Sequence, residues 1–252
     1  MLGDKAWARK FAHCPPLNAS GFLAALFQHF GIQIYAVVAI ATAVYVAFAD
    51  AAPLRLAIAG VYSFAAFSFV EYGLHRYILH ANFLARSRWT ATLWRRLHYD
   101  HHMAPGDVSV LFADPTSSAP FLVLLSLAMA GVVGDLDLFL PLVATNFAAF
   151  LYYEFMHAVA HVPSDFGNAW LRRKKENHLR HHFLDEQANF GIGSNLVDRL
   201  VGTLLVSTEG KSRSPTVRNL GYDDEMAARY PWVREGYLRE FGAEGRRNVA
   251  DA

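Results

Sequence analysis

Ten of the twelve histidines occur in four short groups whose spacing suits metal binding. Residues three or four positions apart lie on one face of a helix, so imidazoles within a group can converge on one point. Protonated imidazoles crowded together would repel one another, and neutral ones without a metal would leave many buried nitrogens without partners. A bound cation resolves both problems. The groups are "HRYILH" (His75, His80), "HYDHH" (His98, His101, His102), "HAVAH" (His157, His161) and "HLRHH" (His178, His181, His182).

The first group differs from the other three in its spacing. His75 and His80 are five residues apart, which puts them well round a regular α-helix from each other. A metal shared by these two residues therefore requires the helix to end or bend near Leu79. His13 and His29 have no histidine neighbours, and we assign them no role.

The number of imidazoles predicts two metal ions. Imidazole suits iron, zinc, copper and nickel, so the ligand type alone does not select the metal. Two six-coordinate ions offer about twelve positions, and ten imidazoles leave room for oxygen. Glu71 lies four residues before His75 and Glu154 three before His157, where a carboxylate could accept the free ring N–H of a ligand. The alternative is that both are interfacial charges at helix ends.

Four uncharged apolar segments precede these groups in pairs. They are residues 31–49, residues 56–70, "PFLVLLSLAMAGVVG" from Pro120 and "LFLPLVATNFAAFLYY" from Leu138. Such runs approach the length that crosses a hydrocarbon core, and they are uncommon in soluble helices. We therefore predict four transmembrane helices in two hairpins, and not a soluble all-helical protein with buried hairpins. Two histidine groups follow each hairpin, so the chain contains a rough internal duplication.

The distribution of charge predicts the orientation in the membrane. Of the 23 lysines and arginines, only Arg55 falls near the two short loops, "DAAP" and "GDLD". The positive-inside rule then places both termini and the long polar segments in the cytoplasm. About thirty mixed residues precede the first apolar run, unlike a cleaved signal peptide. The single Cys14 excludes an internal disulfide and a multi-cysteine zinc site.

We expect a single domain over residues 1–252. It comprises an N-terminal cytoplasmic segment (1–30), a histidine-motif core (71–205) and a polar C-terminal tail (208–252) on the surface. The metal centre could serve transport, storage or catalysis. Transport predicts polar ligands near the bilayer midplane, whereas the predicted spans hold almost no ionisable residue before their cytoplasmic ends. Catalysis on lipid is favoured, and a non-enzymatic metal-binding or metal-transport protein is the second class.

The histidine order resembles that of the fatty acid hydroxylase superfamily, which also contains sterol desaturases. Within it, the chain is most similar to fatty acid 2-hydroxylases, which act on the acyl chains of sphingolipids. The resemblance covers residues 71–205, and the histidine pattern is far more specific than the flanking "HHxAP", "HHF" and "FGI". It rests on "EYGLHRYILH", "LHYDHHMAPGDVSVLF", "YEFMHAVAH" and "NHLRHHFLDEQANFGIGSNLVDRLVGTL".

The resemblance implies an all-α integral membrane fold in which a cytoplasmic helical cap carries the ten histidines as ligands of two iron ions. Zinc can replace iron in a purified protein, and O2 is the co-substrate. Asp107 and Tyr153 match polar positions near such sites and are candidate catalytic residues. The eukaryotic 2-hydroxylases often carry an N-terminal cytochrome b5 domain, for which residues 1–30 are too few. A separate electron donor is therefore expected: a cytochrome b5-like protein, a ferredoxin or a reductase.

The sequence thus predicts a membrane di-iron monooxygenase that hydroxylates a lipid acyl chain at C2. An unactivated C–H bond requires a metal–oxygen oxidant, which protein side chains alone do not supply. The alternative enzyme is a sterol or carotenoid hydroxylase or desaturase of the same superfamily. The expected partners are the lipid substrate, the membrane and the electron donor, with no nucleic acid.

Overall fold

A computed structural model describes residues 17–49, 53–164 and 166–250. Within these ranges the chain is helical and has no β-strand, only an isolated bridge between Leu17 and Ser164. The predictions for His13, for Cys14 and for most of the N-terminal segment lie outside the described residues. So does most of the "DAAP" loop.

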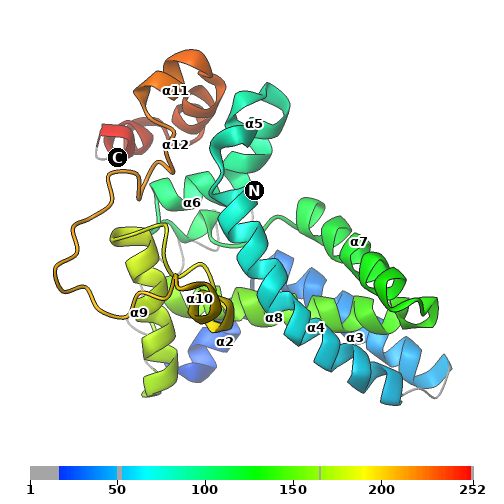
Figure 1. Ribbon diagram of the computed structural model, residues 1–252. Coiled ribbons are helices and arrows are strands. Elements are labelled where there is room, and N and C mark those ends of the chain that lie inside the picture. The colour runs from blue at the N-terminus through cyan, green and yellow to red at the C-terminus, as the bar shows by residue number, and fades with distance from the viewer. Residues whose placement is uncertain (1–16, 50–52, 165, 251–252) are drawn as a thin grey trace.

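Four helices in the described ranges are long and apolar enough to cross a membrane. They are α3 (Phe30–Ala49), α4 (Pro53–Leu74), α7 (Pro115–Val133) and α8 (Phe139–His161), and they form the two predicted hairpins (Figure 1). The prediction of an all-helical protein with four spans is confirmed. Helix α7 begins five residues before Pro120 because Asp114 accepts a hydrogen bond from the Thr116 N–H, and Pro115 suits the first turn.

Helix α8 lies in the centre of the bundle and packs against α3, α4 and α7. Polar pairs tie it to its neighbours: the hydroxyls of Ser63 and Thr145 are 2.7 Å apart, and the Asn146 side chain donates to Ser126 at 2.9 Å. Such pairs satisfy polar groups that would otherwise face an apolar interior. Because α8 is held on three sides, its last turns place His157 and His161 at a fixed point.

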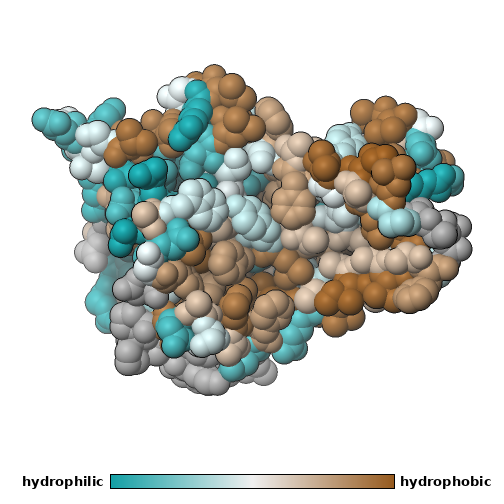
Figure 2. All heavy atoms as spheres, turned by 90° about the horizontal axis from the view of Figure 1, so that it is seen from below, coloured by the Kyte–Doolittle hydropathy of each residue, from teal (hydrophilic) through white to brown (hydrophobic). Residues whose placement is uncertain are grey.

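The outer faces of the spans are apolar and exposed. Val61 on α4, Val132 on α7 and Phe48 on α3 are 75%, 82% and 87% exposed. Figure 2 shows hydrophobic residues gathered over the half of the molecule formed by these helices, and hydrophilic residues concentrated at the opposite end. An exposed apolar surface of this extent is unfavourable in water and suits a lipid environment.

The remaining helices form a cap on the ends of α4 and α8. The π-helical turns η1 (His75–Leu79) and η3 (Arg95–Tyr99) continue from α4 and α5, and short 3₁₀ turns connect several elements. The bounds are η2 (Asn82–Arg86), α5 (Arg88–Trp94), α6 (Asp100–Met103), η4 (Val108–Val110), η5 (Leu136–Leu138), α9 (Ala169–Phe183), α10 (Leu196–Val201), α11 (Asp224–Arg229) and α12 (Trp232–Ala250). A short α2 (Ala19–Phe27) precedes the first span.

The C-terminal tail packs on the cap through a few buried side chains, while most of its residues stay partly or fully exposed. Tyr222 and Tyr237 are fully buried and pack edge-to-face on Tyr99. Residues 209–213 do remain exposed. The high charge of the tail obscures its few apolar side chains in the sequence, and helices α11 and α12 bury some of them against the cap.

Candidate metal centre

The ten histidines of the four groups come together as two sets of five where the cap meets the ends of α4 and α8. Within each set the candidate ligand nitrogens lie within 4.8 Å of one another. All ten rings are buried except that of His161, which is half-buried. Group A is His75, His80, His98, His102 and His181, and group B is His101, His157, His161, His178 and His182.

The π-helical turn at the end of α4 brings together His75 and His80, which are five residues apart. The His80 N–H donates to the His75 carbonyl at 3.0 Å, five residues back. This wider turn brings the two rings to one side, with their centroids 4.8 Å apart. The helix ends at Leu79, as the spacing required. A π-turn is rare and often marks a functional site, because it moves one side chain out of the α-helical register.

Each His-x2-His-His motif divides its members between the two groups. The first and last histidines, four residues apart, share a group, and the middle one lies in the other. Neighbouring side chains on a helix point about 100° apart, so a pair of adjacent histidines can face two centres at once. His101 thus joins the group of the second half of the chain, and His181 joins the group of the first. The two halves of the duplication exchange one imidazole each.

Backbone carbonyls fix the protonation of several rings. In group A, the Nδ1 atoms of His75, His102 and His181 lie 2.6, 2.9 and 2.7 Å from the carbonyl oxygens of Phe190, Val217 and Ala188. A carbonyl only accepts, so each Nδ1 carries the proton, and the neutral ring presents a bare Nε2 to the group. In group B, His161 Nδ1 donates to the Pro105 carbonyl at 2.9 Å.

Burial keeps these rings uncharged. It lowers the pKa of His102 to about 3, and it holds the pKa of His181 well below the ordinary histidine value. Desolvation disfavours the imidazolium form, so both rings are neutral at pH 7 and keep a lone pair for a metal.

The spacing of the ligand nitrogens fits a bound cation. His102 Nε2 and His181 Nε2 lie 3.2 Å apart, although both are without a proton and cannot hydrogen-bond to each other. Nitrogens about 2.1 Å from one ion lie about 3 Å apart when they are adjacent ligands. In group B, His161 Nε2 is buried and has no hydrogen-bond partner among the described residues. Each group therefore fits one metal ion, and an all-imidazole set permits iron or zinc.

The two carboxylates expected beside the ligands act elsewhere. Glu71 accepts hydrogen bonds from the backbone N–H groups of Ile192 and Gly193, and Glu154 accepts one from Ala113 at 3.0 Å. In the described ranges neither carboxylate bonds to a histidine. For His75, the Phe190 carbonyl takes the place that the sequence assigned to Glu71.

The loop of residues 188–193 is the support that sequence reasoning missed. It supplies two of the three carbonyls that orient group A, and the buried Asp198 holds it: the two carboxylate oxygens accept from the Phe190 and Gly191 N–H groups at 2.9 and 2.8 Å. Glu71 accepts the next two amide N–H groups, so α4 and α10 together form a hydrogen-bonded clamp on the loop. The run "NFGIG" with an aspartate soon after was the available signal.

The two candidate catalytic residues have different surroundings. The Tyr153 ring lies 5.8 Å from the His157 ring and stacks on Phe150. The Asp107 side chain accepts the Ser109 N–H at 2.9 Å and caps a short turn. Tyr153 therefore borders the metal centre, whereas the bonding of Asp107 is that of a helix cap.

Comparisons with known proteins identify related sequences. A family model described as "Fatty acid hydroxylase" matches residues 60–203. Fatty acid 2-hydroxylase of Mus musculus is 30% identical over 142 residues, 55% of this chain and 37% of that protein. Dihydroceramide fatty acyl 2-hydroxylase FAH2 of Arabidopsis thaliana is 31% identical over 144 residues, 54% of this chain and 55% of that protein. The chain thus matches between about a third and a half of the length of these relatives.

A solved structure shares the fold. It is described as "Full length scs7p (only hydroxylase domain visible)", and it superimposes with a TM-score of 0.60 at 22% identity, over 73% of this chain and 67% of that one. The similarity supports the arrangement of the spans and the cap.

Proposed function

Because the chain belongs to the fatty acid hydroxylase family, we propose that it is an integral membrane enzyme that hydroxylates a lipid acyl chain at C2. The observation that carries the proposal is the pair of five-imidazole groups at the cap end of four apolar helices. We assign the ten histidines as ligands of two iron ions. Zinc has undemanding coordination preferences and can occupy the same nitrogens in a purified protein.

The proposed reaction replaces one C–H bond of the acyl chain by C–OH. One atom of O2 enters the product and the other leaves as water, with two electrons and two protons supplied from outside. Iron in the two groups would supply the O2 chemistry that an unactivated C–H bond needs. The protein's own contribution is to keep the imidazoles neutral, to fix them through backbone carbonyls and to exclude water by burial.

The expected position of attack follows from how a lipid would lie. An acyl chain among the apolar spans presents its polar end to the cap, so the carbons next to the carboxyl or amide group come nearest to the histidines. The names of the relatives, fatty acid 2-hydroxylase and dihydroceramide fatty acyl 2-hydroxylase, support C2. Tyr153, beside His157, is the side chain that we expect to contact the substrate near this carbon. A sterol or carotenoid substrate is the alternative.

The orientation and the electron supply are part of the same proposal. We infer that both termini and the cap lie in the cytoplasm, and the even number of spans and the sparse Lys and Arg residues in the short loops support this orientation. Electrons would come from a separate donor protein, of the cytochrome b5, ferredoxin or reductase type.

Product analysis with labelled oxygen tests the function. The purified chain, loaded with iron and given a reductase system and oxygen-18 gas, is offered ceramides, free fatty acids, sterols and carotenoids. We expect a 2-hydroxyacyl product that carries one labelled oxygen by mass spectrometry. His101→Ala and His181→Ala, each removing the crossing ligand of one group, should abolish the product while the fold is retained. Oxidation confined to sterols or carotenoids would reject the acyl substrate and favour the alternative.

A further inference from the structure

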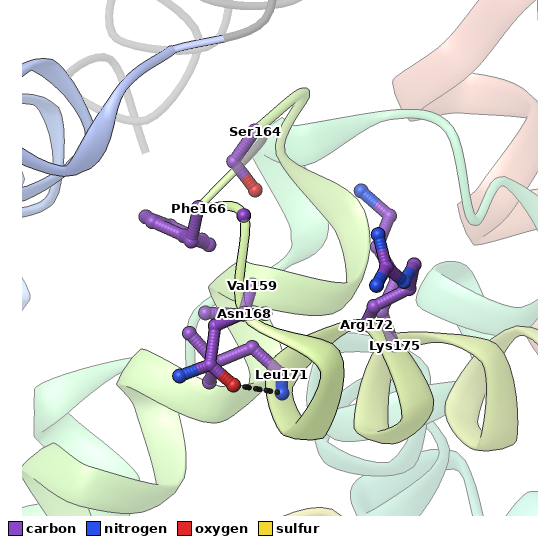
Figure 3. A pocket seen from close by; sticks show the side chains of 8 residues that line it. Val159, Ser164, Phe166, Asn168, Leu171, Arg172 and Lys175 are labelled. Atoms are coloured by element: carbon purple, nitrogen blue, oxygen red, sulfur yellow. Dashed lines mark hydrogen bonds between the residues drawn. The ribbon is translucent and has the colours of Figure 1, made fainter.

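A cavity of about 300 Å³ lies at the junction of α8 and α9, outside the histidine groups. Phe166 and Leu171 contribute apolar surface, and the side chains of Arg172 and Lys175 lie together on the α9 side (Figure 3). The described lining contains these two cations and no acidic side chain. Its residues are Val159, Ser164, Phe166, Gly167, Asn168, Leu171, Arg172 and Lys175.

Arg172 and Lys175 have no opposite charge beside them within the part of the chain that the structure describes. Neither Arg172 nor Lys175 forms an ion pair with a residue in the described ranges. Lys175 is half-buried, and the one hydrogen bond of its ammonium to a described residue is long, 3.4 Å, to the carbonyl oxygen of Val162. Partial burial lowers the pKa of Lys175, because the charged form loses hydration. An anionic guest would supply the missing counter-charge.

The end of helix α9 does not provide the anion site by itself. The side-chain oxygen of Asn168 already accepts the N–H groups of Trp170 and Leu171, at 2.9 and 3.1 Å. The positive charge of the cavity therefore comes from the cationic side chains and not from free backbone amides.

The cavity adjoins metal group B through both helices. Lys175 precedes His178 by three residues, so the two side chains share a face of α9 about 5 Å apart along the axis. On α8, Val159 lies between His157 and His161 in sequence, and the Val162 carbonyl that Lys175 contacts follows His161 directly. A group held by Lys175 thus lies about one helical turn from the imidazoles.

We propose that this cavity binds the negatively charged head group, a carboxylate or a phosphate, of the lipid that the enzyme hydroxylates. Arg172 and Lys175 donate charge-assisted hydrogen bonds to the anion, and Phe166 and Leu171 cover the first carbons of the lipid. The inference rests on the proposed function. It adds that the enzyme selects acidic lipids over neutral ones, and that Arg172 and Lys175 set this preference.

Equilibrium binding tests the inference without catalysis. The purified full chain in detergent is titrated by native mass spectrometry with phosphatidic acid, a free fatty acid and a neutral ceramide of matched chain length, and with inorganic phosphate. We expect at least one acidic lipid to bind about tenfold tighter than ceramide. Arg172→Gln with Lys175→Gln should abolish this preference and leave ceramide binding unchanged. Arg172→Gln alone should weaken the preference for the acidic lipid. Because the Arg172 side chain is exposed, this substitution should not disturb the fold.

Arg173→Gln is the matched control, because it removes one positive charge from the next residue, which does not line the cavity. This variant should keep the wild-type preference. Tighter binding of the fatty acid would identify a carboxylate head group, and tighter binding of phosphatidic acid a phosphate. Equal binding of ceramide and acidic lipids, equal losses in Arg173→Gln, or binding of inorganic phosphate alone would overturn the inference. Selective binding without a hydroxylated product would contradict the proposed function and leave the site intact.

Discussion

Replacing Asp198 by asparagine should weaken metal binding in group A and spare group B. The wild-type carboxylate accepts the Phe190 and Gly191 N–H groups with separate oxygens, and one oxygen also accepts the Thr203 hydroxyl at 2.8 Å. Asparagine keeps the shape but offers only one acceptor. Its NH2 group must then face a backbone N–H, and the loop that presents the Phe190 carbonyl to His75 loses one of its anchors.

The magnitude follows from the bonds that change. A buried hydrogen bond to a charged group contributes about 1.5 to 3 kcal/mol, and two donors forced together add to the loss. Asp198 is fully buried, so water cannot restore the bond. Removing an outer partner of a metal ligand typically costs about 10- to 100-fold in metal affinity. We expect a loss in that range for one of the two ions.

The assay is metal retention against a graded chelator. The iron-loaded variant and the wild type are equilibrated with increasing chelator, and metal per chain is counted by elemental analysis. The wild type should lose its ions at high chelator, whereas Asp198→Asn should lose one ion early and keep the other. Asp185→Asn is the control, because this carboxylate of the same connection accepts a single exposed amide, that of Gln187, at 2.9 Å.

Two outcomes would refute the reasoning. If Asp198→Asn released both ions together at low chelator, the loop would be supporting the whole cap and not one group. If it released neither early, the Phe190 carbonyl would be held without Asp198, and the clamp would be irrelevant to the metal.

Four further predictions follow from the same contacts. Gly191→Ala should destabilise the protein by about 1–3 kcal/mol, since its Cβ would overlap the Ser194 carbonyl, whereas Gly131→Ala has open space and should leave the melting temperature nearly unchanged. His101→Ala should weaken the ion held by the second-half histidines more than the other; equal losses in chelator titrations would contradict the crossing. Burial lowers the pKa of Lys174 to about 8, so the unfolded chain binds more protons between about pH 8 and 10.5 and stability should rise there. Lys174→Met should remove this rise in thermal melts, and an unchanged slope would count against it. A reporter fused to the C-terminus should be active only in the cytoplasm; activity on the far side would show a miscounted span.

The spans and the histidine groups were predictable because both depend on local patterns. An uncharged run of about nineteen residues identifies a membrane helix without knowledge of its neighbours. The spacing of His157 and His161, four residues apart, likewise fixes a shared face. The need for the helix to end after His75 followed from the same geometry, although the π-turn that achieves it did not.

The partners of the rings were not predictable because they come from distant backbone. His75 and His102 each donate to a carbonyl 115 residues further along the chain, and a carbonyl leaves no mark in the residue type. Spacing favoured Glu71, one turn before His75, as the acceptor of the His75 ring N–H. In the folded protein this N–H donates to the Phe190 carbonyl of a distant loop instead. Spacing also could not decide whether His98 shares its group with the histidine three or four residues later, since both lie on its side of the helix.

The exchange of His101 and His181 between the halves has a consequence for biosynthesis. Neither group is complete in a nascent chain until α9 has left the ribosome, and group A also waits for the Val217 carbonyl. A chain that ended after the first hairpin and the first two histidine motifs would contain four imidazoles of group A and one of group B. Binding of both ions would therefore require the finished chain, because a separately expressed half would lack ligands of both groups.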